Sequence, residues 1–391
     1  MKNLKQQNLL IITTDFPDKD NRYYGGIFVK DQIEYLKKYF NKITVIAQVP
    51  RTFGIFDSDK VCKDYNYSNV DVYFPRFWHL PTDFFRKHQD MLRFKAVNKI
   101  LIKNNIDFDI IHAHFTFPSG EIGSKLKELY DKPLVITAHG EYTYSKPFEN
   151  KYWKDKITKI FNNSDYIIGV SEFMASKIKK LGISKNVKVI NNGYNDKIYK
   201  PINQNLCRQK LKISEHKKII LSVGTVRKIK GHEFLIRAIK NVSQKRDDII
   251  CFIVGDDSSK YATSMKALVS ELKLEDKVIF VGKKTQKEIS LWMNACDLFV
   301  LPSIKESFGI VQIEALACGK PIVATQNGGS EEIIKKSDYG YIVPVKNQEQ
   351  LADKINLALD KKWNKNKIFE YSNKYRWPNI IKDIINVYEN V

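Results

Sequence analysis

The sequence predicts an α/β protein with two doubly wound parallel sheets, each in its own domain. Short, almost continuous apolar runs alternate with segments of helical period, and such runs are typical of parallel strands covered on both faces. The alternation occurs in two series along the chain. With 391 residues, the chain is also long enough for two domains that each bury a core. Right-handed crossovers would place helices on both faces of each sheet.

The first series defines an N-terminal domain, residues 1–197. Its apolar runs, such as "NLLIITT", predict strands at 8–14, 42–49, 109–115, 133–140, 166–171 and 187–193. Segments in which apolar residues recur at helical spacing predict helices at about 27–39, 85–104, 119–130, 151–162 and 172–182. We therefore expect a Rossmann-like fold for this domain.

The second series defines a C-terminal domain, residues 198–374, which follows a linker near 194–205. Its apolar runs, such as "KIILSVGT", predict strands at 218–225, 249–256, 277–282, 297–303, 321–325 and 341–345. Helical segments lie between them, so a second Rossmann-like sheet is expected. The last segment, residues 375–391, includes "WPNIIKDIINVYENV", which reads as an amphipathic helix.

The net charge is +21, and the excess of Lys and Arg is spread evenly over the two halves of the chain. A net positive charge favours anionic partners, such as nucleotide sugars, phosphate-bearing acceptors, acidic lipid surfaces or nucleic acid, without choosing among them.

The five cysteines are scattered and form no C-x-x-C pair, which favours a reducing cytoplasm over a disulfide framework or a zinc site. No segment has the length of a spanning helix, so we expect a cytoplasmic protein, with or without peripheral association with the inner face of the cell membrane.

The segment "PSIKESFGIVQIEALACG" follows a predicted strand of the second domain. Ligands of doubly wound sheets bind beyond the carboxyl ends of the strands, so this segment is a candidate binding site. It predicts a helix from near Phe308 to Gly319, because Gly319 and Pro321 are stop signals. The amides of Gly309 and Ile310 would then be free to bind a phosphate.

Two carboxylates flank this predicted phosphate site. Glu306 lies just before the helix, and Glu314 lies about two turns inside it. Because a carboxylate beside a diphosphate would be repelled, we expect each Glu to accept hydrogen bonds from hydroxyl groups that flank the phosphates. A diphosphate with one sugar on either side meets that need. As an isolated pair, the same residues would be a surface carboxylate and an ordinary helix residue.

"ESFGIVQIEALACGKPIVAT" resembles the E-x7-E segment of the retaining glycosyltransferases of family four, which have the GT-B fold of two facing Rossmann-like domains. Further segments of the chain resemble that family in order and spacing: "TDFPDKDNRYYGGIFVKDQIEYL", "IHAHF", "ITAHG", "VINNGYN", "VGTVRKIKGHEFLIRA", "VIFVGKKTQKEISLWMNACDLFVLPS" and "NGGSEEII". The C-terminal "YRWPNIIKDIINVYENV" is similar to the helix that crosses back to the first domain in this family. The resemblance covers nearly the whole chain.

The resemblance implies roles for individual residues. Glu306 would contact the donor sugar near its anomeric carbon, Lys230 would stabilise the leaving diphosphate, and His139 would hydrogen-bond the donor sugar; these three are the candidate catalytic residues. Glu314 would hold the ribose. The remaining expected donor contacts are Gly25, Gly26, Gly224, Arg227, Gly282, Lys283, Ser307, Phe308, Gly309 and Ile310. Glycine suits a close approach of the backbone to a diphosphate because it has no Cβ.

The chain departs from the family pattern at two positions. Thr225 stands where the family often has an arginine, so we expect Arg227, with Lys228 behind it, to be the second diphosphate cation. Asp257 stands where the family commonly has the second glycine of a G-x-G motif. The sequence therefore does not determine which groups line the donor pocket near Asp256.

The resemblance implies a retaining hexosyltransferase that needs no cofactor, since the nucleotide sugar is a substrate. Uridine diphosphate sugars are the expected donors, with guanosine diphosphate sugars second, and the acceptor would be a saccharide or a lipid-linked molecule in polysaccharide or glycoconjugate synthesis.

The chain has three D-x-D spacings, at Asp18/Asp20, Asp57/Asp59 and Asp107/Asp109. Asp107 and Asp109 precede a predicted strand, at the wrong end for ligand, and the others lie in loops outside the matched motifs. We expect no metal.

Other classes of protein remain open at this point. A glycoside hydrolase also needs two carboxylates, but Lys230 and a phosphate-binding helix would serve no purpose there. A nucleotide-sugar epimerase of the same fold would bind its donor in the same way. Nucleic-acid binding fits the net charge, but no basic stripe with interleaved aromatics supports it and we expect no specific nucleic acid.

His112 and His114 fit either structural or acceptor-site roles. Basic stretches such as "RFKAVNKILIK" and "KYWKDKITKI" would meet anionic headgroups if the acceptor is membrane-bound.

Overall fold

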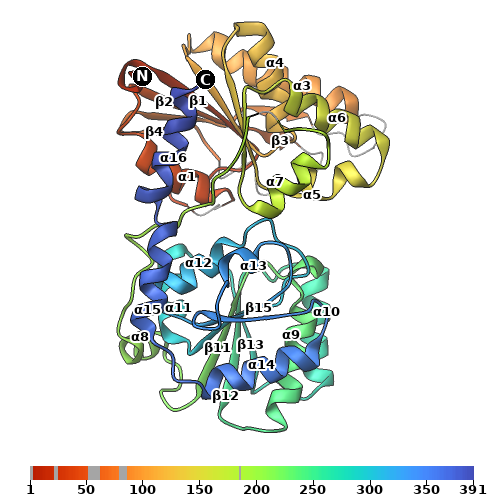
Figure 1. The fold of residues 1–391 in the computed structure, drawn as a ribbon, viewed down its shortest axis with the longest axis vertical. Coiled ribbons are helices and arrows are strands. Elements are labelled where there is room, and N and C mark those ends of the chain that lie inside the picture. Colours follow the sequence, from red (N-terminus) through yellow and green to blue (C-terminus); the bar gives the residue numbers. More distant parts are fainter. Residues whose placement is uncertain (1–2, 22–24, 52–61, 79–85, 185) are drawn as a thin grey trace. The chain divides into compact units, whose positions relative to one another are not determined.

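A computed structural model describes residues 3–21, 25–51, 62–78, 86–184 and 186–391. Their contacts divide the chain into two compact units, Met1–Asn192 with Trp377–Val391, and Gly193–Arg376. The divisions fall after Asn192 and Arg376, whereas the sequence analysis places its boundaries after residues 197 and 374. Each unit contains one large sheet with helices on both faces (Figure 1), which confirms the predicted fold class.

The first unit contains a sheet in the order β10-β9-β8-β7-β1-β2-β5-β4, in which only the β4–β5 pairing is antiparallel. Its strands are β1 (Asn8–Thr13), β2 (Lys42–Ala47), β4 (Tyr65–Tyr67), β5 (Val70–Tyr73), β7 (Ile110–His114), β8 (Leu134–Ala138), β9 (Tyr166–Gly169) and β10 (Val187–Val189). A separate parallel pair joins β3 (Val49–Arg51) to β6 (Arg76–Trp78). All six strands predicted for this unit are present, although each is shorter than predicted, the last most of all. The short strands between residues 49 and 78 were not predicted.

The helices of the first unit are α1 (Ile27–Leu36), α3 (Arg86–Lys103), α4 (Ser119–Tyr130), α5 (Glu141–Tyr144), α6 (Lys151–Asn162), α7 (Glu172–Lys179) and α16 (Trp377–Glu389). Helices α1 and α16 cover one face of the sheet, and α3, α4 and α6 gather on the other (Figure 1). Asn150 and Ser171 cap α6 and α7 by accepting hydrogen bonds from the amides of Trp153 and Met174.

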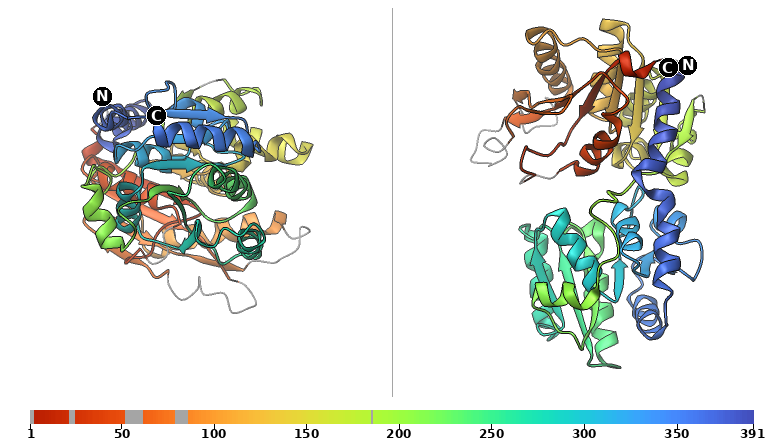
Figure 2. Two further views of the ribbon diagram at one scale, coloured as in Figure 1. Left: turned by 90° about the horizontal axis from the view of Figure 1, so that it is seen from below. Right: turned by 90° about the vertical axis from the view of Figure 1, so that its left-hand side faces the viewer.

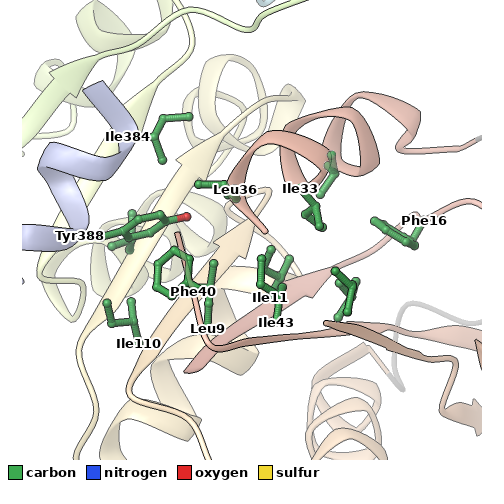
Figure 3. Packing of buried hydrophobic residues seen from close by; sticks show 14 of the residues in the cluster. Leu9, Ile11, Phe16, Ile33, Leu36, Phe40, Ile43, Ile110, Ile384 and Tyr388 are labelled. Carbon is green, nitrogen blue, oxygen red and sulfur yellow. The ribbon is translucent and has the colours of Figure 1, made fainter. Parts of the chain in front are cut away.

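Helix α16 supplies part of the first unit's core although it lies at the far end of the sequence. Helix α16 lies beside the first unit (Figure 2), and its side chains Ile380, Ile381, Ile384 and Tyr388 are buried in that unit's core. Figure 3 shows Ile384 and Tyr388 beside residues of α1 and the sheet. Burial of one such side chain contributes about 1.5–3 kcal/mol. The hydrophobic effect therefore attaches this helix to the first unit.

The second unit contains a parallel sheet in the order β13-β12-β11-β14-β15-β16. Its strands are β11 (Lys218–Val223), β12 (Ile249–Val254), β13 (Val278–Gly282), β14 (Leu298–Leu301), β15 (Ile322–Thr325) and β16 (Gly340–Val343), which match the six predicted strands. Its helices are α8 (Gln204–Leu211), α9 (His232–Ser243), α10 (Lys260–Glu271), α11 (Gln286–Ala295), α12 (Ile310–Ala317), α13 (Ser330–Ile333), α14 (Gln348–Asp360) and α15 (Lys365–Ser372). Helices α9, α10 and α14 cover one face, and α11 and α12 cover the other (Figures 1 and 2).

Candidate active site

The centre of the second sheet is a point where the strand order reverses. β11 and β14 are neighbours, but the chain continues from β11 to β12 on one side and from β14 to β15 on the other. At such a switch point the loops beyond the two carboxyl ends separate and leave a crevice for a ligand. Lys230 lies in the loop after β11, and Glu306 lies in the loop after β14. Strand order therefore brings together two residues that are 76 positions apart in the sequence.

Lys230 and Glu306 form an ion pair at this switch point. The Lys230 Nζ donates a hydrogen bond to Glu306 Oε1 over 2.6 Å, and the two side chains are 31% and 10% exposed. The two loops are also joined through their backbones, since the amide of Ile304 donates to the carbonyl of Ile229 over 2.8 Å. The carboxylate is thus held beside the cation in a partly desolvated place, where electrostatic interactions are stronger than in water.

Gly231 fixes the position of Lys230. It follows the 3-10 turn Lys228–Lys230 with φ 68°, a left-handed conformation that favours glycine. A Cβ at this position would lie 2.1 Å from the carbonyl oxygen of Pro302. The loop after β11 therefore packs directly against the loop after β14, and no larger residue allows that approach.

Helix α12 begins at Ile310, two residues later than predicted, because Gly309 adopts the left-handed conformation as its N-cap (φ 87°). Glu314 is then just over one turn inside the helix, not about two. Both Glu306 and Glu314 are buried, each with 8% exposure. The first turn of an α-helix has amide groups without helical partners, so α12 directs unpaired donors and the positive end of its dipole toward the loop that contains Glu306.

The loop after β15 supports the Glu306 segment. The Glu306 amide donates to the carbonyl of Asn327 over 3.0 Å, and the Asn327 side chain accepts hydrogen bonds from the amides of Gly329 and Ser330. A Cβ on Gly329 would lie 2.5 Å from the carbonyl oxygen of Phe308. Asn327 is therefore a positioning residue that the sequence analysis missed. The sequence signal for it is the Asn-Gly-Gly turn that follows a strand after one intervening residue.

The other expected donor contacts of the second unit lie in loops that follow the strands. Gly224 directly follows β11, and Gly282 ends β13 with φ 77°. Arg227 and Lys283 are exposed. Both act on Asp256, whose pKa is lowered first by its hydrogen bonds from Ser258 and further by these two cations. Arg227 forms no ion pair with any residue that the structure describes.

Gly25, Gly26 and His139 belong to the first unit. Gly26 is the N-cap of α1 with φ 68°, and a Cβ there would lie 2.1 Å from the carbonyl oxygen of Asp15, just beyond the end of β1. Gly25 precedes it in the same turn. His139 directly follows β8 and is 7% exposed.

Three histidines lie side by side at the carboxyl ends of β7 and β8. The His114 Nδ1 is 3.0 Å from the His139 Nε2, and their rings are stacked. Burial lowers the pKa of His114 to about 3 and holds the pKa of His139 well below its ordinary value. Both rings are therefore neutral at pH 7, so one of the facing nitrogens donates and the other accepts.

His112 has both ring nitrogens satisfied inside the fold. Its Nδ1 is 2.6 Å from the Tyr388 hydroxyl of α16, and its Nε2 is 2.7 Å from the Thr137 hydroxyl. The residue is fully buried. These contacts favour a structural role for His112. His114 differs, because its Nε2 is buried and has no hydrogen-bond partner among the residues placed by the structure.

The Asp107/Asp109 pair lies just before β7, at the amino end of the first sheet. The Asp109 carboxylate accepts a hydrogen bond from the Asn8 amide at the amino end of β1, and Asp57 and Asp59 lie outside the described residues. Across the described ranges, no group of three or more His, Cys, Asp or Glu is arranged to hold a metal ion. The absence of a metal requirement stays a prediction.

Among the residues that the structure describes, none of the helices combines the length and the apolar character needed to span a bilayer.

Two family models match the chain. The model described as Glycosyltransferase Family 4 matches residues 26–197, and the model described as Glycosyl transferases group 1 matches residues 203–375. An uncharacterized glycosyltransferase of Methanocaldococcus jannaschii is 29% identical over 391 residues, covering 98% of this chain and 99% of that protein. The N-acetyl-alpha-D-glucosaminyl L-malate synthase of Bacillus anthracis is 29% identical over 267 residues, covering 66% of this chain and 68% of that protein. A D-inositol 3-phosphate glycosyltransferase of Corynebacterium aurimucosum is 29% identical over 272 residues, covering 65% and 64%.

Solved structures share the fold over nearly the whole chain. Sucrose-phosphate synthase from Thermosynechococcus elongatus superimposes with a TM-score of 0.80 at 20% identity, covering 98% of this chain and 99% of that chain. The Anabaena protein HepE, in complex with UDP-glucose, superimposes with a TM-score of 0.76 at 22% identity, covering 99% and 100%. These neighbours share the GT-B architecture of two Rossmann-like units.

Proposed function

The chain belongs to the family-four glycosyltransferases of GT-B fold, and from this premise we propose that it moves a hexose from a nucleotide diphosphate sugar to an acceptor with retention of the anomeric configuration and without a metal. The observation that carries the proposal is the meeting of Lys230, Glu306 and the N-terminus of α12 at the switch point of the second sheet. A cation, unpaired amides and buried carboxylates together fit a diphosphate that has hydroxyl groups on both sides.

Lys230 and the first amides of α12 bind the diphosphate in this proposal. As the bond between the anomeric carbon and the phosphate oxygen breaks, its electron pair passes to the diphosphate. The Lys230 ammonium and the helix N-terminus stabilise that charge. The acceptor oxygen forms its bond to the same face of the anomeric carbon and gives its proton to the departing phosphate oxygen. No separate base is required, so none is assigned.

The two buried glutamates orient the donor. Carboxylates accept hydrogen bonds and donate none when ionised, so they suit sugar hydroxyls and not phosphate oxygens. Glu306, paired with Lys230, would accept from hydroxyls of the donor sugar, and Glu314 would accept from the ribose. The proposal also assigns Gly25, Gly26 and His139 of the first unit to the donor, on the basis of the family resemblance.

We assign uridine diphosphate sugars as the first choice of donor and guanosine diphosphate sugars as the second. The support is by analogy, since the HepE structure that shares this fold is described with UDP-glucose. The acceptor is a saccharide or a lipid-linked molecule, in polysaccharide or glycoconjugate synthesis. Thermal-shift screening against nucleotide sugars, followed by nuclear magnetic resonance of the product anomer, tests donor and stereochemistry together. Sugar turnover that needs no acceptor would instead indicate an epimerase.

Peripheral contact with an anionic membrane belongs to the same proposal. The basic stretches 93–103 and 151–160 lie on α3 and α6, which occupy the same side of the first sheet (Figure 1). Lysines on such a side attract acidic headgroups at roughly 1 kcal/mol each near a surface. Vesicle flotation with and without acidic lipid measures this directly, and equal binding to both kinds of vesicle would remove the idea.

A further inference from the structure

The first unit contains a cavity of about 210 Å³ that no site residue discussed so far lines. The lining residues used below are Asp90 and Arg93 of α3, Phe117 of the loop after β7, Tyr142 of α5, and Tyr152 and Trp153 of α6. Phe117 follows the carboxyl end of β7, and Tyr142 follows the carboxyl end of β8. The cavity is therefore at the ligand-binding end of the first sheet, and Tyr142 lies in the short helix α5 that begins two residues after His139.

Aromatic rings form one wall of this cavity. The ring centroids of Phe117, Tyr142 and Trp153 are 4.9 to 5.1 Å apart in each pair. Trp153 is buried, while Phe117 and Tyr142 are partly exposed to the cavity. A hydrogen bond of 2.7 Å between the hydroxyls of Thr116 and Thr143 holds the two loops together. A rigid aromatic wall of this kind suits the apolar face of a sugar ring.

Charged groups form the other wall. The buried carboxylate of Asp90 is paired with the ammonium of Lys156. Arg93 packs its guanidinium over the ring of Phe77, with 4.8 Å between the Cζ and the ring centroid. Its Nε is buried and has no hydrogen-bond partner in the described ranges. Among the described residues at this wall, the two cations Arg93 and Lys156 share one carboxylate, Asp90, so one positive charge is in excess.

A buried guanidinium nitrogen without a partner needs an explanation, because most such groups are satisfied. The fork of an arginine matches the oxygens of a carboxylate or a phosphate, and such charge-assisted bonds are the strong ones. The Arg93 side chain is partly exposed and lines the cavity, so an anionic group of a ligand there would balance the excess charge. A neutral sugar would not.

We propose that this cavity is the acceptor subsite and that it takes a sugar bearing a phosphate or carboxylate, with the ring against Tyr142 and Phe117 and the anion on Arg93. The inference rests on the proposed function and adds the chemical class of the acceptor. A second cavity of about 440 Å³, which shares Asp90 and Tyr152 with the first, continues along α4 and α6 and leaves room for a larger acceptor.

Titration calorimetry of the full chain with glucose 6-phosphate, glucuronate and glucose tests the proposal. We expect at least one anionic sugar to bind about tenfold or more tightly than glucose. The phosphate and the carboxylate probes distinguish the two sources of charge. Equal binding of all three sugars, or no binding of either anionic sugar, would overturn the proposal.

Arg93→Gln should weaken binding of the anionic sugar by about tenfold or more. Lys95→Gln, which removes an exposed cation from the same helix, should leave it unchanged. Retained binding of the anionic sugar in Arg93→Gln would contradict the assignment. If that variant does not fold, Tyr142→Leu replaces it and should weaken all sugar binding several-fold; unchanged binding there would contradict the assignment as well.

Binding of UDP, measured in parallel, separates this inference from the proposed function. The residues proposed to bind the diphosphate, Lys230 and α12, lie in the second unit, so UDP affinity should be the same in wild type, Arg93→Gln and Tyr142→Leu. Normal UDP binding with no selective binding of anionic sugars would refute the acceptor subsite alone. Loss of UDP binding by the wild-type chain would refute the proposed function instead.

Discussion

The Lys230 Nζ lies 2.6 Å from Glu306 Oε1, across the switch point of the second sheet. The cation expected to bind diphosphate and the carboxylate expected to bind the donor sugar are therefore paired with each other before any donor arrives. A diphosphate must compete with Glu306 for Lys230, while the pair holds both side chains in place. This relationship determines how the two residues respond to substitution.

Substitution of Lys230 by Gln should lower kcat by about 10²–10³-fold, because the leaving diphosphate loses its nearest cation in the transition state. UDP affinity should also fall. Steady-state kinetics and calorimetry measure the two effects. The matched control is Lys287→Gln, an exposed lysine of α11 in the same unit, which should behave as wild type. A kcat within about twofold of wild type in Lys230→Gln would exclude the assigned role.

Glu306→Gln should separate catalysis from nucleotide binding. The neutral amide cannot form an ion pair with Lys230, so that cation is held less strongly and is more available to the diphosphate, and UDP affinity should rise by about two- to fivefold. Transfer should fall by about 10²-fold because the donor sugar loses a carboxylate acceptor. Calorimetry with UDP and transfer assays on the same preparation give both values. Weaker UDP binding would show that the ion pair does not compete with the nucleotide.

Much of the fold follows from local sequence, because every strand of the second sheet is a nearly continuous apolar run. The β4–β5 hairpin was not predicted because its segment, "YNYSNVDVY", mixes polar and apolar residues and contains no apolar run. The start of α12 was placed two residues early because a left-handed Gly309 cannot be recognised from helical periodicity. The contact between Lys230 and Glu306 depends on strand order, and the packing of Arg93 against Phe77 depends on tertiary structure. Neither leaves a local signal.

Gly26→Ala should destabilise the first unit more than Gly182→Ala. Both glycines have positive φ, 68° and 84°, so each substitution costs roughly 1 kcal/mol of backbone strain. Only at Gly26 would the new Cβ meet another group, the Asp15 carbonyl oxygen at 2.1 Å, while Gly182 has nothing within 4 Å. The overlap should add about 1–3 kcal/mol. Urea unfolding measures both variants, and equal losses would mean that the turn before α1 relaxes freely.

Stability should fall as the pH drops below about 6.5, through the buried histidines. Burial lowers the pKa of His114 to about 3 in the folded chain, so between these values the unfolded chain binds a proton that the folded chain does not. The free energy of unfolding then decreases by up to about 1.4 kcal/mol per pH unit for this group. Urea unfolding of wild type and His114→Gln at pH 7.5 and 5.5 measures it. The variant should lose less stability on acidification than the wild type. An equal loss would show that the proton taken up on unfolding binds a group other than His114.

The most direct test of the central claim is a crystal structure of the chain with a bound nucleotide sugar. We expect the diphosphate within hydrogen-bond distance of the Lys230 Nζ and the amides of Gly309 and Ile310, with Glu314 at the ribose and Glu306 at the sugar. A donor bound away from Lys230 and α12 would contradict the account.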